Sequence, residues 1–341
     1  MGKKKLLVTF SGGETSAFMG QWLNKKMQDE YEMLFVFANT GMESNETLDF
    51  VDKCESFFGI DINWIEAKVY HNERKASGFV KVDYQTATRN TDWKIRTDTP
   101  FEEVVKKYGI PNHSRLHCTR ELKNNPIKAF AKSIWGDEPY YLALGIRIDE
   151  IDRMNAKKEE LRLIYPLIQK EMQPMTKKHI NFFWTQQPFR LNLKGYQGNC
   201  GACYKKSENK LMQMVLDDIN YFDFLVYLEE KYGNPNGKIP QKIPQTVYDD
   251  ETGEAYEILS LEVLPKEEYK NVFFRNFVSA KEMIEKAKNF KGTIIDTKAL
   301  IRQSNALGKT AENTINNAYG VHNVEVPAYV KAKVQQLPHN Q

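Results

Sequence analysis

Long hydrophobic runs are missing from this sequence. No stretch approaches the roughly 20 apolar residues that a membrane-spanning helix needs. The apolar stretch nearest the start, residues 6–10, is also too short for the core of a signal peptide. These absences argue against helical membrane proteins and exported proteins, so we expect no membrane partner and a cytoplasmic location.

A strong net charge is missing as well. The 341 residues include 48 Lys and Arg against 45 Asp and Glu, which gives a net charge of +3. A net charge this close to zero neither requires nor excludes a nucleic-acid partner. The hydrophobic share of 41% is that of an ordinary globular protein, and the length suits one large domain or two modest ones.

Cysteine is scarce, with four residues in the chain. In the reducing compartment that we expect, disulfides are not anticipated. Cys54 falls on the apolar positions of a helical pattern at 45–58, which predicts a buried core cysteine. The other three, Cys118, Cys200 and Cys203, include a C-x-x-C pair.

What the sequence does contain is a glycine-bearing loop between a strand and a helix. The apolar run at 6–10 stops at Ser11-Gly12-Gly13, and a helix-compatible run follows at 16–26. Glycine permits backbone angles and close approaches that a side chain would forbid. The N–H groups at a helix N-terminus favour an anion, and phosphate is the obvious one. The predicted anion-binding residues are Ser11, Gly12, Gly13, Glu14, Thr15 and Ser16.

Two familiar phosphate-binding motifs do not fit this loop. No Lys follows the glycines, as it does in the ATPase loop G-x-x-x-x-G-K-[ST]. The spacing also differs from the dinucleotide fingerprint G-x-G-x-x-G. An ordinary glycine turn before a helix is the plain alternative.

The first half of the chain alternates predicted strands with predicted helices. This alternation indicates an α/β fold with a parallel sheet and right-handed crossovers. Ligands bind such sheets beyond the carboxyl ends of the strands, where the glycine-bearing loop would lie. A long polar insertion at 70–107 is expected to be a lid or an irregular loop. The strands are predicted at 6–10, 33–38, 61–67 and 140–145, and the helices at 16–26, 45–58 and 125–135.

The last part of the chain is predicted to be mainly helical. The polar segment 249–253 is expected to be a turn or a hairpin tip. In the segment 233–244, prolines at 235, 240 and 244 exclude a helix or a central strand. We predict two domains, residues 1–205 with the loop and the cysteines, and residues 206–341 as an accessory region. Its helices are expected at 207–232, 280–288 and 297–319.

Three segments together resemble a known family. The S-G-G-x-x-S loop at 11–16 is similar to the pyrophosphate-binding loop of the PP-loop ATP pyrophosphatases. Residues 38–47 resemble the D-T-G…P-E-T segment of the phosphoadenosine phosphosulfate (PAPS) reductase family, with Asn39 in place of Asp and Asn45 in place of Pro. Residues 144–153 are similar to its G-x-R-x-x-E-S-x-x-R segment.

The resemblance implies a fold and a nucleotide site. The expected fold is a Rossmann-like, doubly wound parallel sheet of the PP-loop/HUP type. The expected ligand is ATP or a related adenylyl nucleotide with Mg²⁺, and Asn39, Thr40 and Gly41 would border its adenosine. Arg147 would face the phosphates, because a guanidinium recognises phosphate oxygens in a planar, bidentate way. A surface ion-pair network around Arg147 is the alternative.

The cysteines extend the resemblance. Adenylyl-sulfate reductases of this superfamily carry Cys-Cys and a later C-x-x-C, and they hold a [4Fe–4S] cluster. Here His117-Cys118 stands in place of the first pair. The implied metal ligands are Cys118, Cys200 and Cys203, with His117 as a further candidate. Neighbouring side chains of an extended segment point to opposite faces, which favours Cys118 over His117.

The metal itself stays open at this point. Two thiolates in a C-x-x-C turn suit an iron–sulfur cluster. Three Cys with one His also suit Zn²⁺, and the pair alone suits redox chemistry. Lys205 and Lys206, beside the pair, are expected to stabilise its thiolates.

One more absence bears on the reaction. The reductases of this family use a cysteine near the C-terminus as nucleophile, and this chain has no cysteine after Cys203. The resemblance therefore favours an adenylyl-transfer or ATP pyrophosphatase-type enzyme that cleaves ATP at the α-phosphate to activate a target, with sulfur transfer as the next step. The implied catalytic residues are Cys118, Cys200, Cys203 and Arg147.

Two alternatives are retained: a sulfonucleotide reductase that relies on an external thiol, and a non-catalytic nucleotide-binding module. The expected partners are an adenine nucleotide, an acceptor that is a nucleic acid or a small metabolite, a sulfur-donor protein, and further copies in a homo-oligomer. Five basic residues would guide a polyanionic acceptor or else form a solvated face: Lys94, Arg96, Arg115, Arg120 and Lys123.

Overall fold

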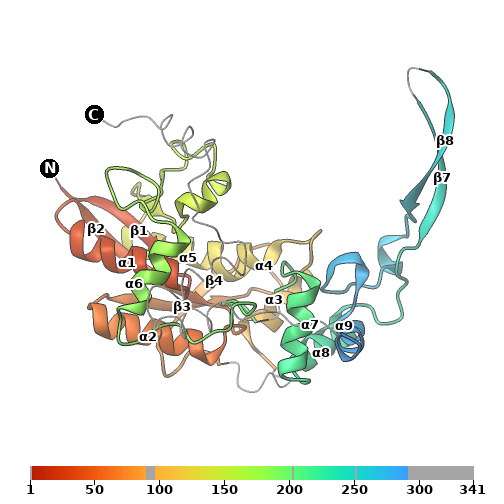
Figure 1. Cartoon of the computed structure of the whole chain (residues 1–341), viewed down its shortest axis with the longest axis horizontal. Coiled ribbons are helices and arrows are strands. Elements are labelled where there is room, and N and C mark those ends of the chain that lie inside the picture. Colours follow the sequence, from red (N-terminus) through yellow and green to blue (C-terminus); the bar gives the residue numbers. More distant parts are fainter. Residues whose placement is uncertain (1, 90–96, 202, 250–251, 291–341) are drawn as a thin grey trace, which may run out of the picture.

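A six-stranded sheet forms the centre of the protein (Figure 1). The computed structural model describes residues 2–89, 97–201, 203–249 and 252–290. The strand order is β4-β3-β2-β1-β5-β6, and all neighbours are parallel except β3 and β4. The strands are β1 (Lys4–Thr9), β2 (Tyr31–Asn39), β3 (Ile62–Lys68), β4 (Gly78–Val82), β5 (Tyr141–Ala143) and β6 (Leu163–Ile164).

Helices cover both faces of this sheet, which confirms the predicted doubly wound α/β fold. Leu6 and Val8 of β1 lie in one apolar cluster, while Leu7 between them lies in another. Successive residues of a strand face opposite sides, so one short apolar run supplies both cores. The first cluster contains residues of α1 (Glu14–Lys26), α2 (Asn45–Phe58) and α6 (Lys177–Thr185), and the second contains residues of α5 (Asn125–Trp135).

Two helices begin and end where local sequence signals predicted. The bounds of α2 agree with the prediction, and the helix stops at Gly59, which takes the left-handed φ of 60° that ends many helices. The bounds of α5 also agree, and Pro126 lies in its first turn. Cys54 is fully buried on α2 and burial raises its pKa, so the prediction of a core cysteine is confirmed.

The polar insertion at 70–107 is more regular than predicted. It contains the edge strand β4 and the helix α3 (Pro100–Tyr108). Helix α3 begins where Glu102 N donates a hydrogen bond to Thr99 Oγ1 at 3.1 Å. The expectation of an irregular loop was wrong for these residues, because the half-buried edge strand β4 has no apolar alternation to reveal it. Lys94 and Arg96 of this insertion lie outside the described residues.

Helical segments run without a break from His117 to α5. The short helix α4 (His117–Thr119) leads into a π-helical turn, η1 (Arg120–Asn124), and this turn leads into α5. Turns of the π type are rare and occur frequently at functional sites. Cys118 lies in α4 and Lys123 lies in η1.

The C-terminal region shares a core with the residues before 205. Val104 and Val105 of α3 lie in one apolar cluster with Phe222, Leu225 and Phe273. The division into two domains stays a prediction, and its boundary does not fall at a break in the packing. The predicted helix at 207–232 is two helices, and the one at 297–319 lies outside the described residues. The helices of this region are α7 (Glu208–Asp217), α8 (Asp223–Tyr232) and α9 (Ala280–Lys288), and its short 3₁₀ turns are η3 (Lys266–Glu268) and η4 (Arg275–Phe277). A further 3₁₀ turn, η2 (Ile148–Arg153), follows β5.

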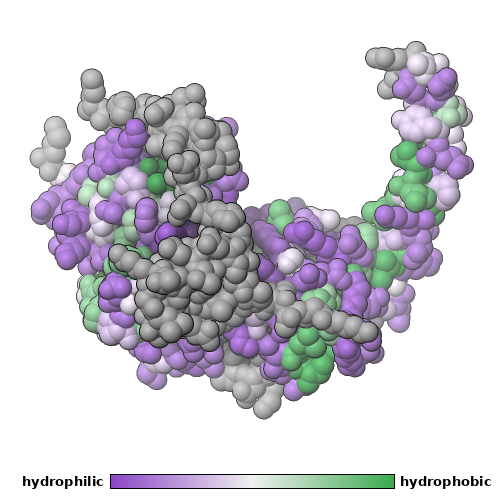
Figure 2. Space-filling model, viewed as in Figure 1, coloured by the Kyte–Doolittle hydropathy of each residue, from purple (hydrophilic) through white to green (hydrophobic). Residues whose placement is uncertain are grey.

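An antiparallel hairpin projects from the body of the protein (Figures 1 and 2). It consists of β7 (Lys242–Tyr248) and β8 (Ala255–Leu261). Of the predicted turn at 249–253, the described residues 249, 252 and 253 lie between the two strands, and Gly253 N donates to Asp249 O at 2.9 Å, although no strands were predicted beside it. Pro244 lies within β7, which is compatible with a two-stranded hairpin because each of its strands has a free edge.

The longest described helix, α2, has 14 residues. In the part of the chain that the structure describes, none of the helices has both the length and the apolar character that a bilayer crossing requires.

We expect the buried carboxyl group of Glu229 to make the protein less stable as the pH rises. Its oxygens accept hydrogen bonds from Phe273 N at 2.8 Å and Ala280 N at 2.9 Å. Burial nevertheless raises its pKa from 4.5 to about 7. The folded protein therefore keeps a proton that the unfolded chain releases. This contribution is complete below pH 4.5 and is lost as the pH rises through 7.

Urea unfolding of wild type and Glu229→Gln across that pH window measures the effect. Each unit of pKa shift corresponds to about 1.4 kcal/mol of unfolding free energy. The non-titrating Gln should flatten the fall in stability, whereas Glu230→Gln, at an exposed neighbouring position, should leave it unchanged. Parallel pH profiles for all three proteins would contradict this account.

Candidate functional site

The loops that follow β1, β2 and β5 lie at one edge of the sheet. These strands are parallel neighbours, so their carboxyl ends point the same way. From β1 the chain proceeds outward to β2 and β3 on one side, and later it forms β5 and β6 on the other. Such a reversal leaves a crevice in which open α/β sheets bind ligands. The glycine-bearing loop and Arg147 follow the two strands at this reversal.

Ser16 holds the loop after β1 in shape. Its Oγ accepts hydrogen bonds from Ser11 N at 3.1 Å and Ser11 Oγ at 2.9 Å, and it donates to Gly13 O at 2.9 Å. Gly12 has a φ of +75°, and a Cβ at this position would come within 2.6 Å of Thr47 Cγ2. The path of the loop therefore requires glycine at position 12.

The N-terminus of α1 faces this loop. Gly13 is the N-cap residue, and among the described residues no side chain caps the helix. The N–H groups of such a first turn favour an anion. The acidic residue of this turn, Glu14, does not oppose an anion, because its carboxylate accepts from Arg190 Nε at 2.9 Å and Nη2 at 3.1 Å. The predicted contribution of Glu14 to phosphate binding is thus left to its backbone.

Arg147 connects the loop after β5 to the first turn of α1. Its Nη1 donates to Thr15 Oγ1 at 3.0 Å. The guanidinium also forms a bidentate pair with Asp149, at 3.0 and 2.9 Å, and lies 3.2 Å from Glu150. Burial acts to raise the pKa of Asp149, but Arg147 outweighs it and holds that pKa below its ordinary value. These ion pairs fix the guanidinium beside the helix N-terminus, so the ion-pair and phosphate interpretations are compatible.

Asn39 braces the loop after β2. Its buried Nδ2 donates to Glu66 Oε1 at 2.6 Å and to Thr88 O at 2.8 Å, and its Oδ1 accepts from Gly41 N at 3.2 Å. The side chain that was predicted to border the adenosine is therefore engaged within the protein. The buried Thr40 hydroxyl is engaged as well, because it donates to Glu43 Oε2 at 2.6 Å and accepts from Met42 N at 3.2 Å, so a nucleotide contact at 39–41 would come mainly from the backbone.

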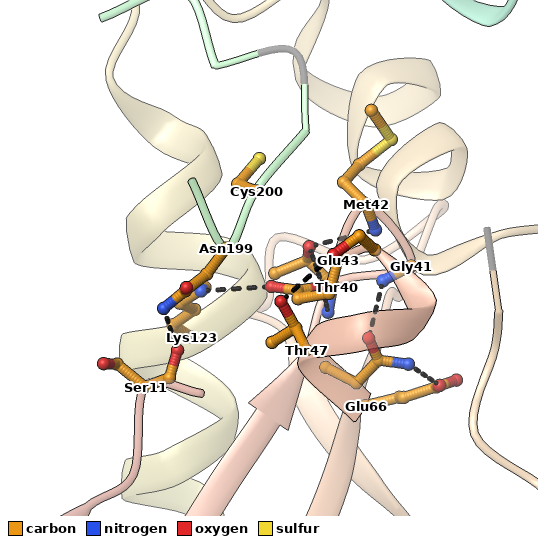
Figure 3. A network of polar contacts seen from close by, with 12 residues as sticks. Ser11, Thr40, Gly41, Met42, Glu43, Thr47, Glu66, Lys123, Asn199 and Cys200 are labelled. Carbon is orange, nitrogen blue, oxygen red and sulfur yellow. Dashed lines mark hydrogen bonds and ion pairs between the residues drawn. The ribbon is translucent and has the colours of Figure 1, made fainter. Parts of the chain in front are cut away.

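Glu43 is a buried carboxylate that sequence reasoning missed. Its Oε2 accepts from Thr40 N at 2.8 Å and Thr40 Oγ1 at 2.6 Å, and its Oε1 accepts from Lys123 Nζ at 3.2 Å (Figure 3). Burial acts to lower the pKa of Lys123, but Glu43 and the thiols of Cys200 and Cys118 raise it overall. Lys123 was predicted to guide a polyanion or to lie on a solvated face. It is instead committed to this network.

The cysteine loop at 199–201 joins the loops after β1 and β2. Asn199 Nδ2 donates to Ser11 O at 2.7 Å, and Gly201 N donates to Met42 O at 2.8 Å. Figure 3 shows Asn199 reaching across to Ser11 while the adjacent Cys200 lies beside the Glu43 network. The C-x-x-C segment is thus tied directly to the candidate phosphate loop.

One of the three predicted cysteine ligands, Cys118, lies against Tyr204. Cys118 Sγ lies 3.6 Å from Tyr204 Oη. Burial raises the pKa of Tyr204, and Cys118, Cys203 and Cys200 add to this shift. Burial also raises the pKa of Cys200 to about 12, with a further contribution from Cys203. Lys206 acts on Cys200 in the predicted direction, but burial outweighs it, so the expected thiolate is not favoured in this structure.

The arrangement does not form a ready metal site. Among the described side chains, no three of the His, Cys, Asp and Glu residues are placed to hold one ion. His117 is buried and its Nε2 lies 3.0 Å from Gly109 O, and burial lowers its pKa. Three thiols would suit an iron–sulfur cluster or Zn²⁺ chemically. Ligation by Cys118, Cys200, Cys203 and His117 stays a prediction, and no chemical step is derived through a metal here.

Four residues enter the site although no motif indicated them. Asn199 and Tyr204 stand next to the C-x-x-C pair, which was their sole signal in the sequence. Glu43 is an acidic residue in the segment after a buried strand, and Arg190 stands in a stretch without pattern. By contrast, the predicted basic residue Arg120 is largely exposed and pairs with Glu121 at 2.7 Å.

We expect Glu43→Gln to destabilise the protein by about 1 to 3 kcal/mol. The amide would present an N–H group toward Thr40 or Lys123, which are themselves donors. Urea unfolding measures this loss. Glu46→Gln is the matched control, because Glu46 lies three residues away and is exposed. Equal stability of the two variants would mean that the Glu43 network contributes little.

Comparisons with known proteins relate the first part of the chain to a family model. Residues 5–112 match the family model described as the phosphoadenosine phosphosulfate reductase domain. The match includes the loops after β1 and β2 and ends before Cys118, Arg147 and the C-x-x-C pair. The recognition of this family from the sequence is confirmed over that segment.

Two relatives are similar to larger parts of the chain. The "uncharacterized nin region protein ORF290" of Escherichia phage lambda is 29% identical over 205 residues, which cover 60% of this chain and 67% of that protein. The "uncharacterized protein MJ0066" of Methanocaldococcus jannaschii is 27% identical over 163 residues, which cover 48% of this chain and 27% of that protein. The chain thus spans about a quarter of the second relative, and neither name states an activity.

Proposed function

We propose, from the match of residues 5–112 to the phosphoadenosine phosphosulfate reductase domain model, that the protein binds ATP or a related adenylyl nucleotide and cleaves it at the α-phosphate. One observation carries the proposal furthest. The Arg147 guanidinium donates to Thr15 Oγ1 at 3.0 Å, beside the uncapped N-terminus of α1. A fixed cation and a helix N-terminus converge on one point, which is the arrangement that a polyphosphate requires.

The chain's own groups account for the departure of pyrophosphate. An oxygen of the acceptor attacks the α-phosphorus, a new P–O bond forms, and the bond from the α-phosphorus to the α–β bridging oxygen breaks. Negative charge then increases on the leaving pyrophosphate. The backbone N–H groups after Gly13 and the Arg147 guanidinium would stabilise that charge. Mg²⁺ would arrive with ATP as part of the substrate and neutralise the phosphates.

Sulfur transfer is the second part of the proposal. Asn199 binds Ser11 O at 2.7 Å, so the cysteine loop lies next to the proposed leaving-group site. Hydrosulfide delivered by a donor protein to the loop with Cys118, Cys200 and Cys203 would attack the acceptor atom that carries the adenylyl oxygen, so that a bond to sulfur forms while the bond to that oxygen breaks and AMP leaves. A bound iron–sulfur cluster or Zn²⁺ would supply a sulfur-binding centre there. The acceptor is a nucleic acid or a small metabolite.

The test is isotope exchange between pyrophosphate and ATP, run with and without candidate acceptors under anaerobic conditions. We expect exchange that depends on an acceptor and disappears in Ser16→Ala, which loses all three hydrogen bonds that shape the loop. Failure of ATP to bind by calorimetry would refute the proposal.

The same protein should be assayed with PAPS or adenylyl sulfate and thioredoxin. Sulfite release without any pyrophosphate exchange would favour the reductase with an external thiol. Nucleotide binding with neither reaction would favour a binding module. The absorbance spectrum and metal content of the anaerobically purified protein would then decide between iron–sulfur, zinc and metal-free thiols.

A further inference from the structure

The hairpin arm, defined as residues 241–249 and 252–262, lies away from the proposed nucleotide site. It projects from the body (Figure 1) and carries apolar side chains along its length (Figure 2). Leu259 and Tyr248 are each 68% exposed, and Tyr256 and Leu261 are about half exposed. A two-stranded hairpin is marginally stable in water, so an arm with this surface calls for a partner.

The ends of the ladder determine which backbone groups point outward. Glu262 N donates to Gln241 O at 2.8 Å, and Asp249 N donates to Glu254 O at 2.9 Å. Hydrogen-bonded and non-hydrogen-bonded pairs alternate along an antiparallel ladder. The pairs 241–262 and 249–254 are therefore hydrogen-bonded, and every second pair between them is not. The β8 residues of those non-hydrogen-bonded pairs direct their N–H and C=O groups away from the hairpin. These outward residues are Ala255, Glu257, Leu259 and Leu261.

The outer edges of the two strands differ. On β7 the same count places Pro244 at an outward position, opposite Leu259. Proline has no N–H to offer, and at an edge it blocks the addition of another strand. β8 has no proline. Its outer edge is therefore the complete one.

The outward groups of β8 are symmetric about Ile258. Residues 257 and 259 lie one step away on either side, and residues 255 and 261 lie three steps away. An antiparallel copy of β8, related by a two-fold axis at Ile258, would use every outward group, because 255 would pair with 261 and 257 with 259. Contacts across a two-fold axis are self-complementary in this way. We propose that β8 pairs with β8 of a second copy of this chain, so that two arms form one four-stranded antiparallel sheet.

The charge of the arm argues against a nucleic acid as its partner. The sequence from 242 to 262 has six acidic residues and one lysine, so a phosphate backbone would be repelled. The antiparallel arrangement directs the acidic tip of each arm, with Asp249 and Glu254, toward the base of the other arm, where Lys238 pairs with Glu268 of its own chain at 2.7 Å. It also opposes Glu254 to Glu262 at each end of the ladder, and these solvent-accessible charges are screened by salt.

The test is the dimer dissociation constant of the full chain, measured by sedimentation equilibrium. Leu259→Pro removes one outward N–H and leaves the bonds to β7 intact, as Pro244 already does on the facing strand. We expect it to raise the dissociation constant at least tenfold. The matched control is Thr246→Pro, which removes an outward N–H from β7 and should change the constant less than twofold. Circular dichroism verifies that both variants fold.

A cross-link tests the position of the axis. Ile258→Cys would place two cysteines opposite each other at a non-hydrogen-bonded pair, within reach of a disulfide. Mild oxidation should link this variant into dimers above the wild-type background. Ser260→Cys, on the same face of β8, should not link. A monomer at all concentrations, equal weakening by both proline variants, or an arm that binds duplex DNA instead would overturn the proposal.

Discussion

Arg147→Ala is expected to bind ATP about 10- to 100-fold more weakly than the wild type, because charged hydrogen bonds contribute about 1.5 to 3 kcal/mol each. In the structure Arg147 touches the first turn of α1 through Thr15 Oγ1 at 3.0 Å. Its removal would also leave Asp149 without its paired cation and Glu150 with Arg153 alone, next to the incoming phosphates. Calorimetric titration with Mg·ATP measures the change.

Two variants separate these contributions. Arg153→Ala is the matched control, since Arg153 pairs with the same Glu150 but is largely exposed, and its affinity for ATP should stay within about twofold of wild type. Arg147→Ala combined with Asp149→Asn removes one unpaired carboxylate and should recover part of the loss. If Arg147→Ala and Arg153→Ala bind ATP equally well, Arg147 serves only the local ion pairs.

Gly12→Ala is expected to abolish measurable ATP binding and to lower the unfolding free energy by about 2 kcal/mol or more. A left-handed φ costs a residue with a Cβ about 1 to 2 kcal/mol. The new Cβ would also come within 2.6 Å of Thr47 Cγ2 and 3.2 Å of Phe37 Cε2. The loop must then shift, which carries its N–H groups away from the phosphates. Calorimetry and thermal unfolding measure the two effects.

Gly59→Ala is the control for backbone strain. Gly59 also has a positive φ, of 60°, but a Cβ there meets nothing within 4 Å. It should lose stability and keep its affinity for ATP. Adding Thr47→Ser to Gly12→Ala removes the clashing methyl group and keeps the hydroxyl that lies 3.2 Å from Ser44 Oγ, so partial recovery of ATP binding is expected. A Gly12→Ala protein with normal affinity would show that the loop does not hold phosphate.

Regular periodicity explains why much of the fold could be predicted. The runs that became β1 and β2 are buried on both faces, so they stand out as continuous apolar stretches. The ends of α2 and α5 carry Gly59 and Pro126, whose backbone preferences act locally. The edge strand β4 is half-buried and the hairpin strands β7 and β8 are largely exposed, and no apolar pattern revealed them.

The candidate site could be predicted only in part. Motif residues such as Ser11, Ser16 and Arg147 are recognisable because their spacing follows a strand end. Their contacts were not recognisable, because burial and pairing depend on the whole fold. Asn39 was predicted to contact the nucleotide, yet its side chain donates hydrogen bonds to Glu66 and Thr88 instead.

By itself, the amino-acid order determined the strand–loop–helix start around Ser11 to Ser16 and the parallel α/β plan, because these follow from backbone freedom and from apolar residues close together in the chain. Only the tertiary structure decided that Asn199 binds Ser11 O across 188 positions and that Glu43 is buried against Lys123. Contacts of this kind depend on how distant elements pack, and no local pattern encodes them.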